Sequence, residues 1–544
     1  MSLLLIRGAL VIDGSNGEPF KGDVAVENGT ITDVSPSIEG GGKTVIEADG
    51  LIVAPGFIDI HSHTDLTIFK HPLAESKAMQ GVTTEVIGNC GIGAFPVDHE
   101  RSAVLIDYLK MHGFHLPPSG LSWNNFTQYA DQLDHIGLGL NLAPLVAHGA
   151  LRIAALGAED RIPSDKGLRS MKRLLADSLE QGAWGLSTGL IYPPGSFAKT
   201  EELVELAKIV ADYGALYTSH IRGEGATLME ALGEAIRIGK KAGVRVEVSH
   251  LKAMGKDNWG RGKEALLKLE KARQSGVDIA ADQYPYEATS TSLAALVPQW
   301  VHVGGTGELL KRLASPEMTG RLRAEILDEI NARGGPSRIL IAEIGSARNI
   351  ELSGKNVSQI AQLWNCPPEI AVVRLLKEEK AAVGAIYFSL SDEDVAAILS
   401  SDQVAVGSDG MGMNAKEDSE KSTHPRSYGT FPRILGLYAR EKGYLSMAKA
   451  IHKMTGLVAG RVGLKNRGLI KPRFIADLVL FDPLTIQDRS TFDHPHQYAT
   501  GVVYAWVNGC PIVQEGIVTG NTPGRVLRRE AFHPVHKSFL EKGV

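Results

Sequence analysis

Five residues of types that bind zinc in proteins each follow a short apolar run in this chain. They are His61, His63, Cys90, His220 and His250. Imidazole nitrogen and thiolate sulfur form a ligand set that suits Zn²⁺, and catalytic zinc sites use three protein ligands so that one position stays open. These residue types therefore indicate a catalytic metal site, provided that the fold brings together positions far apart in the sequence.

The first two of these residues form a His-x-His pair after the strand-like segment Phe57-Ile-Asp-Ile. Because side chains alternate along a strand, His61 and His63 point to the same side and can bind one ion. Cys90 lies in the turn-like sequence Gly88-Asn-Cys-Gly, which is a poor place for a cysteine that only fills the core. The pair and the cysteine are therefore interpreted as metal ligands.

An aspartate completes the set, since Asp409 ends the apolar run Val404-Ala-Val-Gly-Ser. A carboxylate beside a catalytic metal can act as a general base that takes a proton from water activated by the metal. An aspartate before a glycine is usually a turn residue, but at this position it is well placed for catalysis. The sequence therefore predicts Asp409 as the catalytic residue of a metal-dependent reaction.

Chemistry at the C-terminal ends of many short strands is typical of a (β/α)8 barrel, whose active site is built at that face. We therefore predict an α/β protein with a metal-dependent (β/α)8 (TIM) barrel. Helical patterns at 201–213, 226–242 and 262–275 separate strands and support this prediction. The predicted barrel strands are Ile52–Asp59, Thr84–Ile87, Leu138–Pro144, Gly185–Ser187, Ala215–Ser219, Arg245–Ser249, Asp278–Gln283 and Gln403–Ser408.

Both ends of the chain read as short strands. Asn28-Gly29 near one end and Asn508-Gly509 near the other are dipeptides that favour tight hairpin turns. We predict one small β-sandwich domain built from residues 1–54 and 466–544, with the catalytic barrel at 55–465. The interval between the last two barrel strands is far longer than a βα unit needs, so an insertion at about residues 290–385 is expected to cover the barrel mouth.

The composition limits which binding partners and which cellular compartment are expected. The chain is 43% hydrophobic and 22% charged, with a net charge of −5 and no long basic run, so nothing suggests binding to nucleic acid or an anionic membrane. No stretch reaches the roughly 18 apolar residues that span a bilayer. Three sparse cysteines fit a reducing compartment, and a cytoplasmic location is expected.

Taken together, these motifs resemble the amidohydrolase superfamily and, in finer detail, its N-acyl-D-amino-acid deacylases (D-aminoacylases). The resemblance covers nearly the whole chain. Its motifs are Phe57-Ile-Asp-x-His-x-His, Gly88-Asn-Cys-Gly, Ser187-Thr-Gly-Leu-Ile-Tyr-Pro-Pro-Gly, Ser219-His-Ile-Arg-Gly-Glu, Ser249-His-Leu-Lys, Asp282-Gln-Tyr-Pro-Tyr, Gly407-Ser-Asp-Gly and His424-Pro-Arg-Ser-Tyr-Gly-Thr-Phe.

The resemblance implies one tight Zn²⁺ site formed by Cys90, His220 and His250, and a possible second, weaker site at His61 and His63. It also implies that the cysteine replaces the carboxylated lysine that bridges two metals in hydantoinases and dihydroorotases.

The resemblance further implies that Lys252, Tyr284 and Arg426 bind the α-carboxylate of the substrate, with help from Tyr192. A preference for the D enantiomer rests on the resemblance alone. Glutamate-selective members use an arginine in the region that corresponds to residues 289–300. This chain has none there, which favours apolar side chains.

We therefore predict a zinc-dependent enzyme that hydrolyses a small-molecule substrate, an N-acyl-D-amino acid, to a carboxylate and a free D-amino acid. A D-dipeptidase or related amidase with the same metal site stays an alternative. A cyclic-amide hydrolase would need a carboxylated lysine at the end of the fourth strand, where Gly185-Leu-Ser-Thr-Gly has none. A non-catalytic amidohydrolase-like scaffold would have lost ligands that are all present here. The oligomeric state and the occupancy of the second metal site stay open.

Overall fold

Short parallel strands surround the predicted site in the computed structural model, which describes residues 3–39, 44–316, 319–419 and 422–530. They form a six-stranded sheet in the order β17-β13-β12-β11-β10-β9 and a three-stranded sheet in the order β6-β7-β8. The strands are β6 (Phe57–Asp59), β7 (Val82–Ile87), β8 (Asn141–Pro144), β9 (Val146–Ala147), β10 (Gly185–Gly189), β11 (Leu216–His220), β12 (Arg245–Val248), β13 (Ile279–Gln283) and β17 (Val404–Val406).

The two parallel sheets meet at both of their edges. Only Leu145 separates β8 from β9 along the chain. At the other edge Ser62 forms a parallel bridge with Gly410. There the amide of Asp409 donates to the carbonyl of His61 at 2.7 Å. These contacts hold the ends of β6 and β17, which carry predicted site residues, next to each other.

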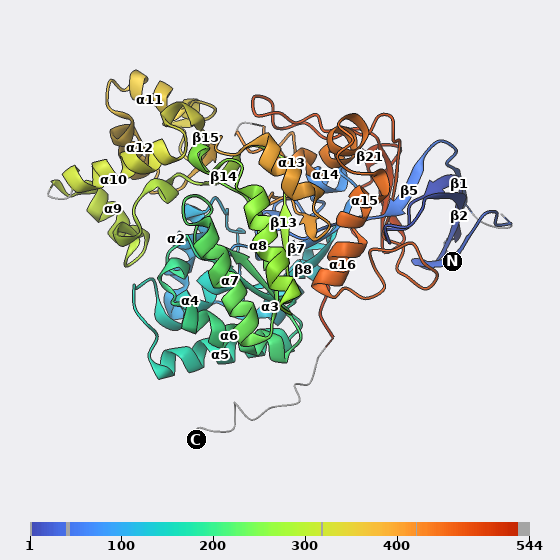
Figure 1. The fold of residues 1–544 in the computed structure, drawn as a ribbon, viewed down its shortest axis with the longest axis horizontal. Helices are drawn as coiled ribbons and strands as arrows, with labels where there is room; N and C mark the ends of the chain where they lie inside the picture. Colours follow the sequence, from blue (N-terminus) through green and yellow to red (C-terminus); the bar gives the residue numbers. More distant parts are fainter. Residues whose placement is uncertain (1–2, 40–43, 317–318, 420–421, 531–544) are drawn as a thin grey trace.

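Helices follow most of the parallel strands and cover them, with α5 to α8 lying side by side (Figure 1). Each packs through an apolar stripe; in α7, Leu228, Ala231, Leu232, Ala235 and Ile238 are buried at helical spacing. The helices of this part are α1 (Glu75–Ala78), α2 (Ser102–Met111), α3 (Phe126–Ile136), α4 (His148–Leu156), α5 (Asp165–Glu180), α6 (Thr200–Asp212), α7 (Leu228–Ala242), α8 (Gly262–Gln274), α13 (Asp392–Ser400), α14 (Arg426–Arg433), the π-helical segment Ile434–Glu441, α15 (Met447–Lys453) and α16 (Gly456–Val462).

The first predicted barrel strand, Ile52–Asp59, is wrong as a single strand. Residues Ile52–Pro55 form β5, which pairs with β18 (Leu478–Phe481) and β1 (Leu3–Val11), whereas β6 pairs with β7. The chain changes sheets at Gly56, where an added Cβ would lie 2.2 Å from the Thr83 side chain. A glycine is therefore needed where the backbone approaches Thr83. In the sequence, this single glycine within an apolar run does not show that the strand ends there.

A nine-stranded sheet combines strands from both ends of the chain, in the order β21-β20-β19-β18-β5-β1-β2-β3 with β4 beside β1. Its remaining strands are β2 (Phe20–Glu27), β3 (Thr30–Ser35), β4 (Thr44–Glu47), β19 (Val502–Val507), β20 (Cys510–Gln514) and β21 (Ile517–Val518). The turns at Asn28-Gly29 and Asn508-Gly509 have positive φ at all four residues, as their sequences predict. Residues 531–544 of the predicted C-terminal part lie outside the described residues.

The segment between β13 and β17 contains structure of its own. Its strands form an antiparallel sheet in the order β14-β16-β15, and α9 to α12 lie on the side of the parallel strands away from the nine-stranded sheet (Figure 1). The elements are β14 (Thr289–Ser292), α9 (Thr306–Ala314), α10 (Thr319–Ala332), β15 (Ile339–Ile344), α11 (Val357–Leu363), α12 (Pro368–Glu378) and β16 (Val383–Tyr387). In the part of the chain that the structure describes, no helix is both long and apolar enough to cross a membrane.

A fully buried lysine connects β6, β7 and the segment just after β17. The Nζ of Lys77 lies 2.7 Å from Asp59 Oδ2, 3.2 Å from Glu85 Oε1 and 2.6 Å from Ser408 Oγ. Burial alone would lower the pKa of Lys77, but the charges of Asp59 and Glu85 outweigh it and raise the pKa above its ordinary value. The lysine is therefore a charged partner of two buried carboxylates.

Lys77→Met is expected to destabilise the protein by about 3–5 kcal/mol, because it leaves these two carboxylates buried without a cation. Chemical unfolding followed by fluorescence measures the loss. Lys110→Met, at an exposed position of α2, is the control and should change little. A Lys77→Met protein as stable as the control variant would contradict this role.

Candidate metal centre

The five candidate zinc ligands converge in two overlapping groups, although they come from the ends of four different strands. The sulfur of Cys90 and one ring nitrogen each of His220 and His250 lie within 4.8 Å of one another, and so do the ligand atoms of His61, His63, Cys90 and Asp409. Cys90 Sγ is 3.3 Å from both His61 Nε2 and His250 Nε2. The cysteine is thus shared by both groups, and all of these residues are buried.

The backbone at three of these positions is unusual. Cys90, His250 and Asp409 have φ values of 55°, 35° and 52°, in the left-handed region that residues with a Cβ rarely adopt. Such conformations cost of order 1–3 kcal/mol each and persist where the surroundings impose them, often at functional sites. Each residue lies just past the end of a parallel strand, so the turn re-aims its side chain toward the centre.

Two carboxylates contact the Nδ1 atoms of His61 and His250, on the side of each ring away from Cys90. Asp282, at the end of β13, lies 3.1 Å from His61 Nδ1 and also accepts the amide of His250 at 2.8 Å. Glu224 lies 3.0 Å from His250 Nδ1. In both rings Nδ1 faces a carboxylate, so Nε2 is the nitrogen that faces Cys90. Carboxylates that accept a hydrogen bond from Nδ1 in this way orient metal-binding histidines.

The donor set fits zinc. Tetrahedral ligands at normal Zn–N and Zn–S distances lie roughly 3.3–3.7 Å apart, and the contact between Cys90 Sγ and His250 Nε2 is in this range. Both ring nitrogens of buried His220 lack a hydrogen-bond partner among the described residues, which is costly unless a metal is bound there. Burial raises the pKa of the Cys90 thiol and lowers that of His220. A cation would stabilise the buried thiolate, and the neutral imidazole is the form that binds metal.

Asp409 lies between the histidine pair and an arginine. Its Oδ1 is 3.0 Å from His63 Nε2 and 3.4 Å from His61 Nε2, and its Oδ2 is 2.7 Å from the Arg426 guanidinium. Burial opposes ionisation of Asp409, but Arg426, His250 and the hydrogen bond from His63 hold its pKa well below the ordinary value. The carboxylate is therefore ionised and able to accept a proton.

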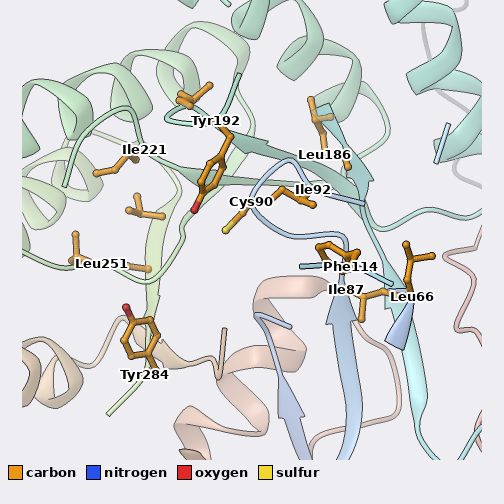
Figure 2. Packing of buried hydrophobic residues seen from close by; sticks show 14 of the residues in the cluster. Leu66, Ile87, Cys90, Ile92, Phe114, Leu186, Tyr192, Ile221, Leu251 and Tyr284 are labelled. Atoms are coloured by element: carbon orange, nitrogen blue, oxygen red, sulfur yellow. The ribbon is translucent and has the colours of Figure 1, made fainter. Parts of the chain in front are cut away.

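A pocket of about 630 Å³ opens onto this centre and has a size typical of small-molecule sites. The four predicted substrate residues line it: Tyr192, Lys252, Tyr284 and Arg426. Figure 2 shows the sulfur of Cys90 and the hydroxyl groups of Tyr192 and Tyr284 directed toward the same space.

The cations and the phenols of this pocket differ in their partners. Lys252 Nζ lies 2.5 Å from Glu224 Oε1 and 2.6 Å from His250 Nδ1. The Tyr284 hydroxyl has no hydrogen-bond partner within the described part of the chain, and its ring lies 5.2 Å from the Arg426 guanidinium carbon. The Tyr192 hydroxyl accepts a hydrogen bond from Thr291 at 3.0 Å. The Tyr284 hydroxyl can therefore both donate to and accept from a ligand, whereas the Tyr192 hydroxyl already accepts from Thr291 and keeps its own proton for donation.

The sequence interpretation did not assign Glu224 or Asp282, although both lie in motifs that it singled out. Glu224 ends Ser219-His-Ile-Arg-Gly-Glu, and Asp282 begins Asp282-Gln-Tyr-Pro-Tyr. The available signals were that Glu224 follows the ligand His220 by four residues and that Asp282 lies at a strand end. Neither spacing reveals that the carboxylate faces a ligand from a different strand.

Comparisons with known proteins identify the family of this chain. A model of the amidohydrolase family matches residues 44–348 and 393–513. The D-aminoacylase of Alcaligenes xylosoxydans xylosoxydans is 35% identical over 528 residues, which are 97% of this chain and 98% of that protein. The N-acyl-D-glutamate deacylase of the same organism is 36% identical over 528 residues, 97% of each.

A solved structure extends the similarity to three dimensions. The N-acyl-D-glutamate deacylase of Bordetella bronchiseptica, complexed with zinc and a phosphonate inhibitor that mimics the tetrahedral intermediate, matches with a TM-score of 0.81 and 33% identity. The match covers 97% of this chain and 100% of that one. The chain therefore belongs to the amidohydrolase family, in its group of D-aminoacylases.

Proposed function

We propose that this protein hydrolyses the amide bond of N-acyl-D-amino acids to a carboxylate and a free D-amino acid. The observation that carries the proposal is the meeting of Cys90, His220 and His250 with an ionised Asp409 at the floor of a pocket whose wall contains Lys252 and Arg426. An N-acyl amino acid requires a metal centre that activates its amide bond and cations that bind its carboxylate. The relatives named as D-aminoacylase and N-acyl-D-glutamate deacylase support the same chemistry.

We assign one tight zinc site to Cys90, His220 and His250, and a second, weaker site to His61 and His63 with the shared Cys90. Support comes from the two overlapping ligand groups and from the ring of His220, whose nitrogens make no hydrogen bond to the described residues. Zinc bound there supplies a Lewis acid that polarises the amide carbonyl and activates water.

Asp409 moves the proton. It takes a proton from the attacking water, holds it on a carboxylate oxygen, and gives it to the amide nitrogen as the bond to carbon breaks. Its place beside His63 and His61 supports this role. Arg426, which pairs with the other oxygen of Asp409, keeps the carboxylate oriented and faces the pocket.

Lys252, Arg426 and Tyr284 bind the substrate α-carboxylate in this proposal, with Tyr192 beside His220. Both cations lie near the Tyr284 ring, with Lys252 Nζ 5.7 Å and the Arg426 guanidinium carbon 5.2 Å from its centroid. A carboxylate between them can accept from both cations and from the phenol. This anchoring orients the scissile amide toward Asp409.

Lys252→Ala is expected to raise KM by roughly 10–100-fold, because a hydrogen bond to a charged group contributes about 1.5–3 kcal/mol. Steady-state kinetics at saturating zinc measure the change. Lys256→Ala, at an exposed position four residues further along, is the control. An unchanged KM in Lys252→Ala would place the carboxylate elsewhere.

We propose a neutral amino-acid side chain for the preferred substrate. Two more arginines line the pocket, and each has a carboxylate of the protein near it. Arg222 pairs with Glu234 at 2.9 Å, and Arg333 stacks on Tyr387 with Glu329 3.7 Å away. The chain is 35% identical to the D-aminoacylase and 36% identical to the N-acyl-D-glutamate deacylase. This difference is too small to indicate the preferred side chain, so the proposal rests on the pocket residues.

The test is hydrolysis of paired N-acetyl-D- and N-acetyl-L-amino acids with neutral and acidic side chains, using protein of measured zinc content. Turnover of the D forms with neutral side chains is expected. Faster cleavage of D-dipeptides would favour the dipeptidase alternative. Faster opening of hydantoins would contradict the proposal, as would the absence of turnover by zinc-loaded protein. The end of β10, Gly185–Gly189, has no lysine for the bridging ligand of cyclic-amide hydrolases.

We also infer that the two parallel sheets together form a closed (β/α)8 barrel spanning residues 55–465. The short gap at Leu145 and the bridge between Ser62 and Gly410 support this closure. In the same proposal residues 1–54 and 466–544 make the small β-domain, and the segment at about 290–385 is an insertion that lines the pocket through β14, the α10 end and β15.

A further inference from the structure

One buried carboxylate contacts both the metal centre and the substrate anchor. Glu224 lies in the loop after β11, four residues beyond His220, and is 7% exposed. Its Oε1 is 2.5 Å from Lys252 Nζ and 3.0 Å from His250 Nδ1, while its Oε2 is 3.6 Å from His220 Nε2. In the proposed reaction it neither moves the proton nor binds the substrate.

We propose that Glu224 is a positioning residue that holds the ligand His250 and the anchor Lys252 in their working orientations. The inference rests on the proposed function, because it takes His250 as a zinc ligand and Lys252 as a carboxylate anchor. It makes two separable claims, one on zinc affinity and one on substrate binding.

The first claim concerns the ring of His250. Its Nε2 faces Cys90 Sγ at 3.3 Å, so Nδ1 is the nitrogen left to face Glu224. Lys252 Nζ also lies 2.6 Å from this Nδ1, and it donates to Glu224 Oε1 at 2.5 Å. Because Glu224 accepts a hydrogen bond from the ammonium, Nδ1 can keep its own proton toward the carboxylate, and Nε2 then offers its lone pair to a metal.

The second claim concerns Lys252, which is 3% exposed. A buried ammonium is costly unless it is paired, and Glu224 provides the carboxylate at hydrogen-bond distance. Lys252 is therefore held at the pocket wall as a charged group before substrate arrives. An aspartate would be too short by one methylene to reach both His250 and Lys252 from the same backbone position.

The loop that carries Glu224 is fixed to the loop that carries its two partners. The amide of Met254 donates to the carbonyl of Glu224 at 2.7 Å, and this backbone bond joins the segments after β11 and β12. The main chain therefore holds the backbone of Glu224 next to the loop that carries His250 and Lys252. This placement suits Glu224 to orient His250 and Lys252 before zinc or substrate binds.

The test is zinc titration of metal-free full-length protein against a competing chromophoric chelator. Glu224→Gln keeps the size of the side chain and removes its charge, and it is expected to weaken zinc binding by about 10–100-fold, as loss of an outer-shell partner does. Glu224→Asp should fall between this variant and the unmodified protein. Glu234→Gln, which changes another buried carboxylate that pairs with Arg222 and contacts no proposed ligand, should keep full zinc affinity.

Kinetics at saturating zinc separate positioning from a general structural role. Glu224→Gln should raise KM through Lys252 while its thermal midpoint stays near that of Glu234→Gln. Zinc affinity and KM equal to those of the unmodified protein would overturn the role of Glu224 alone. If the unmodified protein bound no zinc, the proposed function itself would fall, and this inference with it.

Discussion

Cys90→Ala is expected to lose zinc and turnover together. Cys90 Sγ contacts His61 Nε2 and His250 Nε2 at 3.3 Å and belongs to both ligand groups, so its removal takes a ligand from each proposed metal position. Zinc affinity should fall by more than about 100-fold, the upper end of the range for residues that only orient a ligand. The measurement is metal content after dialysis against a weak chelator, together with initial rates.

The control for this prediction is a second cysteine. Cys366, in the turn before α12, lies outside the pocket, so Cys366→Ala should keep both zinc and activity. If Cys90→Ala retained one equivalent of zinc under the same dialysis, the sulfur would not be a ligand of the tight site. The tight zinc site would then have to be formed by histidines and a carboxylate without the sulfur.

Asp409→Asn is expected to keep its zinc and lose most of its turnover. Asp409 is not part of the group formed by Cys90, His220 and His250, so the tight site stays complete. An amide cannot take up the proton of water, and general acid–base catalysis contributes about 10²–10⁴-fold. The fall should appear in kcat, measured at saturating zinc and substrate.

Asp402→Asn provides the comparison, because Asp402 is exposed and precedes β17, at the opposite end of the strand from Asp409. It should leave kcat unchanged. Near-full turnover by zinc-loaded Asp409→Asn would show that another group moves the proton. His63, which lies 3.0 Å from Asp409, would be the next residue to test.

The local elements follow from local sequence patterns. Helices predicted at 201–213, 226–242 and 262–275 are α6, α7 and α8 with ends shifted by at most two residues. The hairpin turns at Asn28-Gly29 and Asn508-Gly509 were also predictable, since few residue pairs accept two successive positive φ values. These features depend on neighbours within a few residues, which is the information that a sequence pattern contains.

The split of Ile52–Asp59 into β5 and β6 was not predictable from such patterns. Both halves are apolar and buried, so their composition reads as one strand. The division depends on β18, more than 400 residues away, which pairs with β5 and leaves β6 to β7. Strand partners at this separation are decided by the packing of the whole chain.

The sequence by itself determined the chemistry of the centre: a sulfur, four imidazoles and a carboxylate at strand ends, which suit zinc-dependent hydrolysis. Only the tertiary structure decided that Cys90 is shared by two ligand groups, that Asp409 pairs with Arg426, and that Glu224 joins His250 to Lys252. The physical reason is that ligand type is a property of each residue, whereas distance and burial are properties of the folded chain. Spacing along the sequence gives no measure of either once the chain crosses from one strand to another.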